Sequence, residues 1–193
     1  MTELHRRDLD PDPFRQFERW YAEAAVAQEW PERMAVATAD PNGAPSLRMV
    51  LLKSFDEHGL VFFTHASSRK GQELAENPRA ALLLHWASLG RQARVEGIVE
   101  RVADEESDAY WSTRPEAVRR GAVASRQSEV LGSRAELDAR VAAVESLERP
   151  ATWGGYRVVP HAWEFWQHRD DRLHDRFRYR REGTAWVIER LYP

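Results

Sequence analysis

Two cations flank an apolar segment of the chain that is expected to be a buried strand. Arg48 and Lys53 stand on either side of residues 49–52, which read MVLL. Residues five apart in a strand point to opposite faces unless a bulge or a bend intervenes. The two side chains therefore need not bind the same anion.

A second basic group follows a predicted strand and opens a predicted helix. Thr64, Ser67 and Ser68 supply hydroxyl groups, and Arg69 and Lys70 supply two cations. Hydroxyls, cations and a helix N-terminus together make a plausible phosphate site, although a solvated helix start explains the same residues. Lys53 and Lys70 are the only lysines among the 28 basic residues. The other 26 are arginines, so a lysine could stand where an anion site needs a compact ammonium group. Chance explains the presence of two lysines equally well.

A third group lies close to the C-terminus. Trp166 is followed by Arg172, His174 and Arg176. In a strand these three residues would share one face, beside an aromatic ring. Like charges placed so closely are costly unless an anion or an electron-rich group lies among them, which favours a ligand-facing role. The alternative is a hairpin turn at residues 170–171 with solvated charges.

The helices and strands that must position these groups can be read from capping and periodicity. Asp12 and Pro13 open a helix with an apolar face, residues 69–77 form a short helix that Pro78 closes, Asp104 opens another, and a capping box at Ser133 opens one that runs to about Leu147. Tyr110, Arg114, Gln127 and Ser128 belong to this helical stretch and, on their own, are interpreted as helix-surface residues. Strands are predicted at 34–39, 45–55, 60–65, 80–86, 91–102, 156–159, 162–167, 176–181 and 185–191.

This order of elements predicts the α+β class, as one domain over residues 1–193 in which a barrel-like antiparallel sheet carries peripheral helices. Residues 1–12 are expected to be a flexible segment. A net charge of -3 gives no reason to expect nucleic acid or a membrane surface as a partner, and no apolar run reaches membrane-spanning length. A cytoplasmic location is expected.

Several classes of chemistry lack the residues they need. There is no cysteine, so disulfides, thiolate metal sites and thiol nucleophiles are excluded. The seven histidines include no HExxH pair, and no metal site is expected. Neither GxGxxG nor GxxxxGK[ST] occurs. Any nucleotide-like cofactor must be held by side-chain cations and hydroxyls.

From about Pro13 to Pro193 the chain resembles the pyridoxamine 5'-phosphate oxidase family. The blocks that carry the resemblance are RMVLLK at 48–53, VFFT at 61–64, SRKGQELAENP at 68–78, RQARVEG at 91–97, YWSTRP at 110–115, SRQS at 125–128, WGGYRV at 153–158, EFWQ at 164–167 and RLHDRFRY at 172–179. The resemblance implies an FMN-binding split β-barrel that forms a homodimer with FMN at the subunit interface. It implies oxidation of pyridoxamine or pyridoxine 5'-phosphate at C4', with a hydride passing to the flavin and on to O2, giving pyridoxal 5'-phosphate and hydrogen peroxide.

The resemblance also implies roles for individual residues. The phosphate and ribityl end of FMN would be bound by Arg48, Thr64, Arg69 and Lys70, with further cofactor contacts from Met49, Val50, Leu51, Lys53, Phe63, Gln127 and Ser128, and with Gln92, Trp166 and Arg176 beside the flavin ring. The substrate phosphate would be bound by Lys53, Tyr110 and Arg114. Arg172 and His174, the expected catalytic pair, would orient the substrate ring. Arg48 and Lys53 would then serve two different phosphates.

The departures from the family pattern concern the substrate. Val118 stands where a serine is usual, His168 stands where a small residue is expected, and the N-terminal segment is short. Three hypotheses remain: an oxidase of phosphorylated B6 vitamers, an FMN oxidase of the phenazine-biosynthesis type, and a flavin-binding protein without turnover. Lys53 favours the first, because it suits a phosphorylated substrate. Val118 and the short N-terminus leave the third open.

Overall fold

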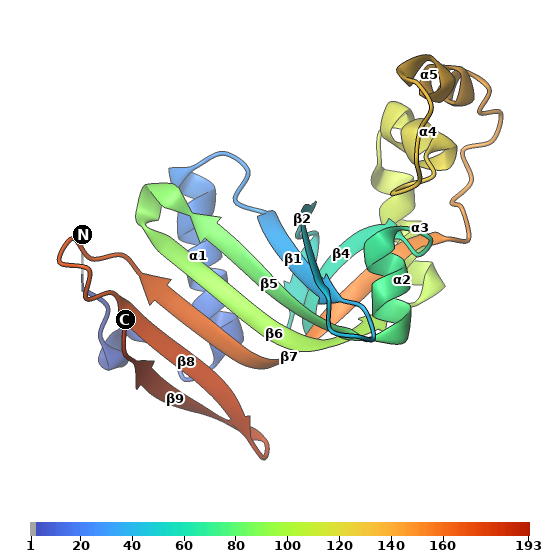
Figure 1. The fold of residues 1–193 in the computed structure, drawn as a ribbon. Coiled ribbons are helices and arrows are strands. Elements are labelled where there is room, and N and C mark those ends of the chain that lie inside the picture. The colour runs from blue at the N-terminus through green and yellow to red at the C-terminus, as the bar shows by residue number, and fades with distance from the viewer. Residues whose placement is uncertain (1–2) are drawn as a thin grey trace.

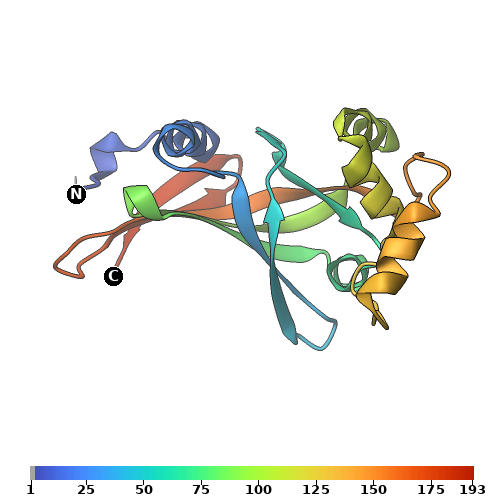
Figure 2. The same ribbon diagram turned by 90° about the horizontal axis from the view of Figure 1, so that it is seen from above.

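A single antiparallel sheet, curled into part of a barrel, organises the computed structural model of this chain, in which residues 3–193 are described. Figures 1 and 2 show α1 (Pro13–Ala27) lying against the sheet towards one end, with the other α-helices gathered at the opposite end. The α+β prediction is confirmed. Among the described residues no helix is both long enough and apolar enough to span a membrane.

Nine strands form this sheet within residues 3–193, and all their pairings are antiparallel. The strands are β1 (Arg33–Ala39), β2 (Pro45–Leu51), β3 (Ser54–Asp56), β4 (Gly59–His65), β5 (Arg79–Trp86), β6 (Arg91–Arg101), β7 (Trp153–Gln167), β8 (Asp175–Glu182) and β9 (Ala185–Leu191). The order across the sheet is β2-β1-β5-β6-β7-β4-β3, and β8 and β9 continue from β7.

The long strand β7 is where the barrel splits. One of its edges pairs with β6, whereas the other pairs with β4 through residues 153–158 and then with β8 through residues 162–167. Pro160, which has no N–H to donate, lies between the two segments, and the β6–β7 register shifts at Glu96/Gly97. The sequence predicted two separate strands here, and the structure corrects this to one strand that changes partners.

The predicted strand over residues 45–55 is also corrected. It breaks after Leu51, because Leu52 turns into the core and its N–H donates to Glu32 O at 2.9 Å. The N–H of Lys53 then donates to Val61 O at 2.9 Å, so the chain leaves the edge of β1 and joins β4 through β3. This bend changes the relative direction of Arg48 and Lys53.

The helices begin where their capping residues predicted. The Asp12 side chain accepts from Phe14 N at the start of α1, Ser68 caps α2 (Arg69–Glu76), and Ser133 caps α5 (Arg134–Ala142). Two further helices are α3 (Asp104–Thr113) and α4 (Glu116–Ala124), and 3-10 turns occupy η1 (Arg6–Asp8) and η2 (Ala87–Leu89).

The predicted end of α5 at about Leu147 is wrong, because the helix stops at Ala142. The chain returns towards α3, where Trp111 Nε1 donates to Leu147 O at 2.9 Å. Arg149 pairs with both Asp104 and Asp108 of the same helix. These contacts need an extended segment in place of further helical turns.

Aromatic side chains fill the core between α1 and the sheet. Phe17 and Trp20 of α1 are buried against Trp86, Trp163 and Phe165 of the strands, with ring centroids 5.2 to 6.4 Å apart. Such contacts add to the burial of apolar area that drives folding. The core therefore holds α1 against the sheet.

Residues 3–12, which belong to the segment 1–12 that the sequence predicted to be flexible, make definite contacts, and residues 1 and 2 lie outside the described part. Leu4 and Leu9 are buried in the core. The N–H of Leu4 donates to Asp175 Oδ2 at 3.1 Å, and the hydroxyl of Tyr179 donates to Asp10 O at 2.7 Å. Apolar burial and these two bonds fix the segment to β8.

Candidate functional site

A cleft of about 1020 Å³ opens beside β2, between α2 and α3. Its lining includes thirteen of the residues that the sequence singled out: Arg48, Met49, Val50, Leu51, Lys53, Phe63, Thr64, Arg69, Lys70, Tyr110, Arg114, Gln127 and Ser128. The remaining lining residues are Pro45, Ser46, Leu47, Thr113, Pro115, Val118 and Trp153. Both Arg48 and Lys53 reach the cleft because the chain bends between them at Leu52.

The first set of cations in the cleft is the α2 cationic group, formed by Arg48, Arg69 and Lys70. Lys70 is buried, and its Nζ donates to Thr64 Oγ1 at 2.9 Å, Gln127 Oε1 at 2.9 Å and Ser68 Oγ at 3.2 Å. Burial, together with the charge of Arg48, lowers the pKa of Lys70 to about 8. The partners of this ammonium group among the described residues are all neutral, so it keeps a charge that an anion could compensate.

The helix that carries Lys70 depends on close packing at its first turn. Gly71 lies so near the preceding segment that an added Cβ would be 2.4 Å from Ala66 O. A side chain at this position would push α2 away from β4. The SSRKG sequence thus lets the start of the helix approach Thr64.

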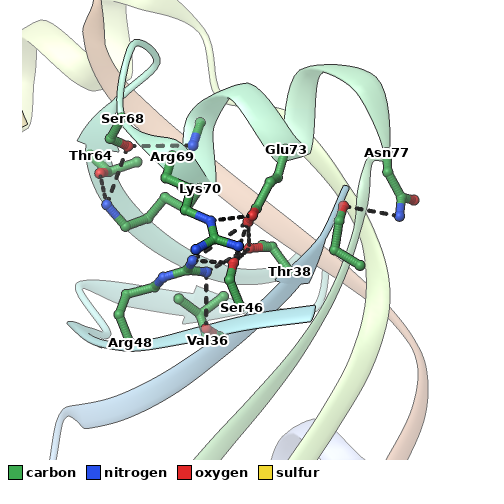
Figure 3. A network of polar contacts seen from close by, with 12 residues as sticks. Val36, Thr38, Ser46, Arg48, Thr64, Ser68, Arg69, Lys70, Glu73 and Asn77 are labelled. Atoms are coloured by element: carbon green, nitrogen blue, oxygen red, sulfur yellow. Dashed lines mark hydrogen bonds and ion pairs between the residues drawn. The ribbon is translucent and has the colours of Figure 1, made fainter. Parts of the chain in front are cut away.

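One buried carboxylate organises the two arginines of the α2 cationic group (Figure 3). Glu73 accepts from Arg69 Nε at 2.8 Å, lies 3.5 Å from Arg48 Nη2, and also accepts from the hydroxyls of Thr38 and Ser46. Burial alone would raise the pKa of Glu73, but these hydrogen bonds and the charge of Arg48 hold that pKa at about 2. The Glu73 carboxylate is therefore ionised. The three cations together with Glu73 have a net charge of about +2.

Sequence reasoning missed this network around Glu73. A signal was present on β1, whose buried positions alternate through Met34, Val36 and Thr38, so that a hydroxyl occupies a core-facing position. Thr38 is paired with Ser46 across β1 and β2. A polar residue within a buried alternation indicates a polar partner on the facing element.

The second set of cations is the α3 cationic group, formed by Lys53 and Arg114 with Tyr110. The Arg114 guanidinium lies 4.8 Å from the ring centroid of Trp153 and 5.2 Å from that of Trp111. Among the described residues its Nη1 is buried without a hydrogen-bond partner, and burial lowers the pKa of Arg114. Lys53 Nζ lies 5.9 Å from the centroid of Tyr110, which stacks on Phe63 at 4.2 Å. A half-buried cation with one buried, unpaired donor atom indicates a site for an anionic ligand.

Gln127 and Ser128 lie in the connection between α4 and α5, not on a helix surface as their segment suggested. Ser128 adopts a positive φ of 76°, which is uncommon for a residue other than glycine. The Gln127 side chain meets Thr64 and Lys70, more than fifty residues earlier in the chain. The α4–α5 connection thus closes one side of the cleft.

The five remaining predicted residues, here called the β7–β8 loop group, do not line the cleft. Gln92, Trp166 and Arg176 are adjacent in register across β6, β7 and β8. Trp166 is 4.6 Å from the ring of His174, and Arg176 donates to Glu164 Oε1 at 2.7 Å and to Tyr192 O at 3.0 Å. Figure 1 shows β7 running from the α3 end of the molecule to this opposite end.

The prediction that residues 172, 174 and 176 share one face of a strand is wrong. β8 begins at Asp175, and Arg172 and His174 belong to the preceding loop. Arg172 has a positive φ of 66°, so the chain turns at this residue. The alternative of a turn near residues 170–171 is the one that the structure contains.

Comparison with known proteins gives one consistent family. A model described as pyridoxamine 5'-phosphate oxidase matches residues 22–148, and one described as the pyridoxine 5'-phosphate oxidase C-terminal dimerisation region matches residues 153–193. The pyridoxine/pyridoxamine 5'-phosphate oxidase of Paraburkholderia phymatum is 53% identical over 96% of this chain and 91% of its own length. The protein of that name from Rubrobacter xylanophilus is also 53% identical, over 95% of this chain and 88% of its own.

Two solved structures are similar over almost the whole chain. The crystal structure of PhzG from Burkholderia lata, in complex with tetrahydrophenazine-1-carboxylic acid, has a TM-score of 0.93 and 37% identity, covering 100% of this chain and 98% of that chain. A pyridoxamine 5'-phosphate oxidase-related, FMN-binding protein from Nostoc punctiforme has a TM-score of 0.77 and 17% identity, covering 96% and 100%. The second comparison concerns the fold alone, and it confirms the predicted split barrel.

Proposed function

Because this chain belongs to the pyridoxamine 5'-phosphate oxidase family, we propose that it is an FMN-dependent oxidase that converts pyridoxamine or pyridoxine 5'-phosphate to pyridoxal 5'-phosphate with O2. The observation that carries the proposal is the presence of two separate cationic groups in one cleft. A flavin phosphate and a substrate phosphate need two such groups.

The α2 cationic group suits the phosphate of FMN. A phosphate monoester carries about -1.5 to -2 charges at pH 7, and the net charge of about +2 left by Arg48, Arg69, Lys70 and ionised Glu73 complements it. Thr64, Gln127 and Ser128 supply neutral polar groups beside it, and Met49, Val50, Leu51 and Phe63 supply apolar wall further along the cleft. FMN, when bound, supplies the redox chemistry, and the protein supplies position and charge.

The α3 cationic group suits the phosphate of the substrate. The unpaired Nη1 of Arg114 lies within the same cleft as Lys53. Charge-assisted hydrogen bonds to a phosphate would be donated by both cations, and for half-buried Arg114 they would compensate the cost of its burial. Lys53 would face both ligands, because it stands between β2 and Tyr110.

The proposal requires a homodimer, because the β7–β8 loop group does not line the cleft of its own protomer. In a dimer this group could instead complete the cleft of the partner. Residues 153–193, which include four of its members, match the dimerisation region of the family. Leu47, Met49 and Leu51 on β2 are apolar side chains that are exposed in one chain, as expected of an interface. In the dimer, we infer, Gln92, Trp166 and Arg176 border the flavin ring, and Arg172 and His174 orient the substrate.

A second candidate function, oxidation of a phenazine precursor, is favoured by the similarity to PhzG and by Val118. This side chain lines the substrate side of the cleft and offers no hydrogen-bond donor. The test is to load the purified protein with FMN and measure peroxide under air, with pyridoxine 5'-phosphate and with a reduced phenazine carboxylate in parallel. Peroxide with the first compound supports the proposal. Peroxide with the phenazine compound alone would mean that the substrate is a phenazine precursor. FMN binding without peroxide from either compound would support a flavin-binding protein without turnover.

A further inference from the structure

The loop between β7 and β8 places two imidazoles against one tryptophan. The ring of His174 lies 4.6 Å from Trp166 and 5.2 Å from His168, and His168 lies 6.0 Å from Trp166. The N–H of His168 donates to Gly90 O at 2.8 Å, which fixes the start of the loop to the end of η2. The two imidazoles are therefore held close together by both the backbone and the ring contacts.

A backbone donor selects one tautomer of His174. The N–H of Arg169 donates to His174 Nδ1 at 3.1 Å, so Nδ1 is an acceptor and the ring proton is on Nε2. Protonation of Nδ1 would turn this hydrogen bond into a contact between two donors. The loop thus disfavours the imidazolium form and leaves Nε2–H available to a ligand.

The charges around the two rings separate their roles. His168 Nε2 lies 3.3 Å from Asp170 Oδ1, so His168 has a carboxylate partner for a proton. The charges of His168 and Arg172 disfavour a proton on His174, whereas the carboxylate of Asp171 favours one. Asp171 is itself paired with Arg169 at 2.7 Å. On the adjoining strands, Gln92 and Trp166 are neutral and Arg176 is engaged by Glu164.

We propose that His168 is a positioning residue for His174: together with the Arg169 amide it keeps the imidazole of His174 neutral, with Nε2–H directed to a substrate. The inference rests on the proposed function, in which His174 faces the substrate, and it goes beyond the family pattern, in which a small residue is expected at position 168. Burial, then His168 and Arg172, lower the pKa of His174, in agreement with the geometry. His168 has the Asp170 carboxylate beside it as a partner for positive charge, whereas the Arg169 amide opposes a proton on Nδ1 of His174.

The test is an NMR titration of the histidine side chains in the purified dimer with FMN added, for wild type, His168→Gln, His168→Phe and the control His161→Gln. His161 is an exposed residue of β7 outside the cluster. Removal of the neighbouring positive charge is expected to raise the apparent pKa of His174 by about 0.5 to 1 unit in both His168 variants and to leave it unchanged in the control.

The two replacements separate charge from packing. His168→Phe keeps a ring against His174 and Trp166. If the role of His168 is merely structural, only His168→Gln should shift the pKa of His174. That result would overturn the proposal, and so would the absence of a shift in both variants. If turnover of pyridoxine 5'-phosphate is observed, the acidic limb of kcat/KM should move to higher pH by the same amount in both variants. The titration needs no turnover, so an inactive protein would refute the proposed function while the His168 test still gives its own answer.

Discussion

Replacement of Arg114 by methionine should weaken substrate binding without destabilising the fold. In the free protein the Arg114 guanidinium has a buried Nη1 that no other residue of 3–193 pairs with, and an unpaired buried donor costs about 1–3 kcal/mol. Methionine fills similar space against Trp111 and Trp153 but loses cation–π contacts worth about 0.5–2 kcal/mol. The two effects oppose each other, so the free energy of unfolding should change by no more than about 1 kcal/mol.

The loss appears when the substrate is bound. A charge-assisted hydrogen bond to a phosphate contributes roughly 1.5–3 kcal/mol, which corresponds to a rise in KM of about ten- to a hundredfold. The assay is peroxide formation with pyridoxine 5'-phosphate, alongside a fluorescence titration of FMN and thermal unfolding. Flavin affinity should be unchanged, because the α2 cationic group keeps its own residues.

Arg119→Met is a matched control for this variant. Arg119 lies on α4 outside the lining of the cleft, and within the described part of the chain its buried Nε also lacks a partner. Its replacement should leave KM unchanged. The reasoning is refuted if Arg114→Met has a normal KM, or if it loses flavin while the remaining flavin-loaded enzyme binds substrate normally.

Three further predictions concern the division of the cleft. Arg48→Met should reduce FMN affinity by about ten- to a hundredfold with little change in KM, whereas Lys53→Met, at a residue that would face both ligands, should raise KM by a larger factor than it weakens FMN binding; equal effects of both variants in both assays would contradict two sites. Because the pKa of Lys70 is lowered to about 8 and a bound phosphate would raise it, FMN binding should take up a proton above pH 8, and Kd should rise by up to about tenfold per pH unit there; a Kd that is flat from pH 8 to 10 would show that Lys70 stays charged. Val118→Ser should lower the KM for the phosphorylated substrate by supplying a hydroxyl donor, and a raised KM would indicate that Val118 packs against an apolar substrate.

Local signals in the sequence predicted most of the individual elements. Asp12, Ser68 and Ser133 cap the helices as expected, because a cap depends only on the residues next to it. The end of α5 was missed because it depends on contacts of Leu147 and Arg149 with α3. Such contacts join residues far apart in sequence, and periodicity does not report them.

The sequence predicted which residues form the site but not how they are arranged in space. The resemblance named thirteen residues that line one cleft, but the simple alternation of a strand sent Arg48 and Lys53 to opposite faces. The bend at Leu52, which follows from its burial, brings them to the same cleft. Similarly, the sequence left open whether Arg172 and His174 share a strand face with Arg176 or follow a turn, because the turn at Arg172 has no glycine to mark it. Glu73 lies within the SRKGQELAENP block, but no role was assigned to it, and its role emerges only when β1, β2 and α2 are packed together.

The most direct test of the central claim compares phosphorylated and unphosphorylated ligands at each site of the cleft. FMN and riboflavin are titrated into the flavin-free protein, and the FMN-loaded protein is then given pyridoxine 5'-phosphate or pyridoxine under air while peroxide and aldehyde product are measured. We expect FMN to bind at least about tenfold more tightly than riboflavin, since each phosphate contact is charge-assisted, and peroxide to form in equal amount to aldehyde only with the phosphorylated substrate at low concentration. Equal affinity for the two flavins, or equal KM for the two substrates, would contradict two phosphate sites in this cleft.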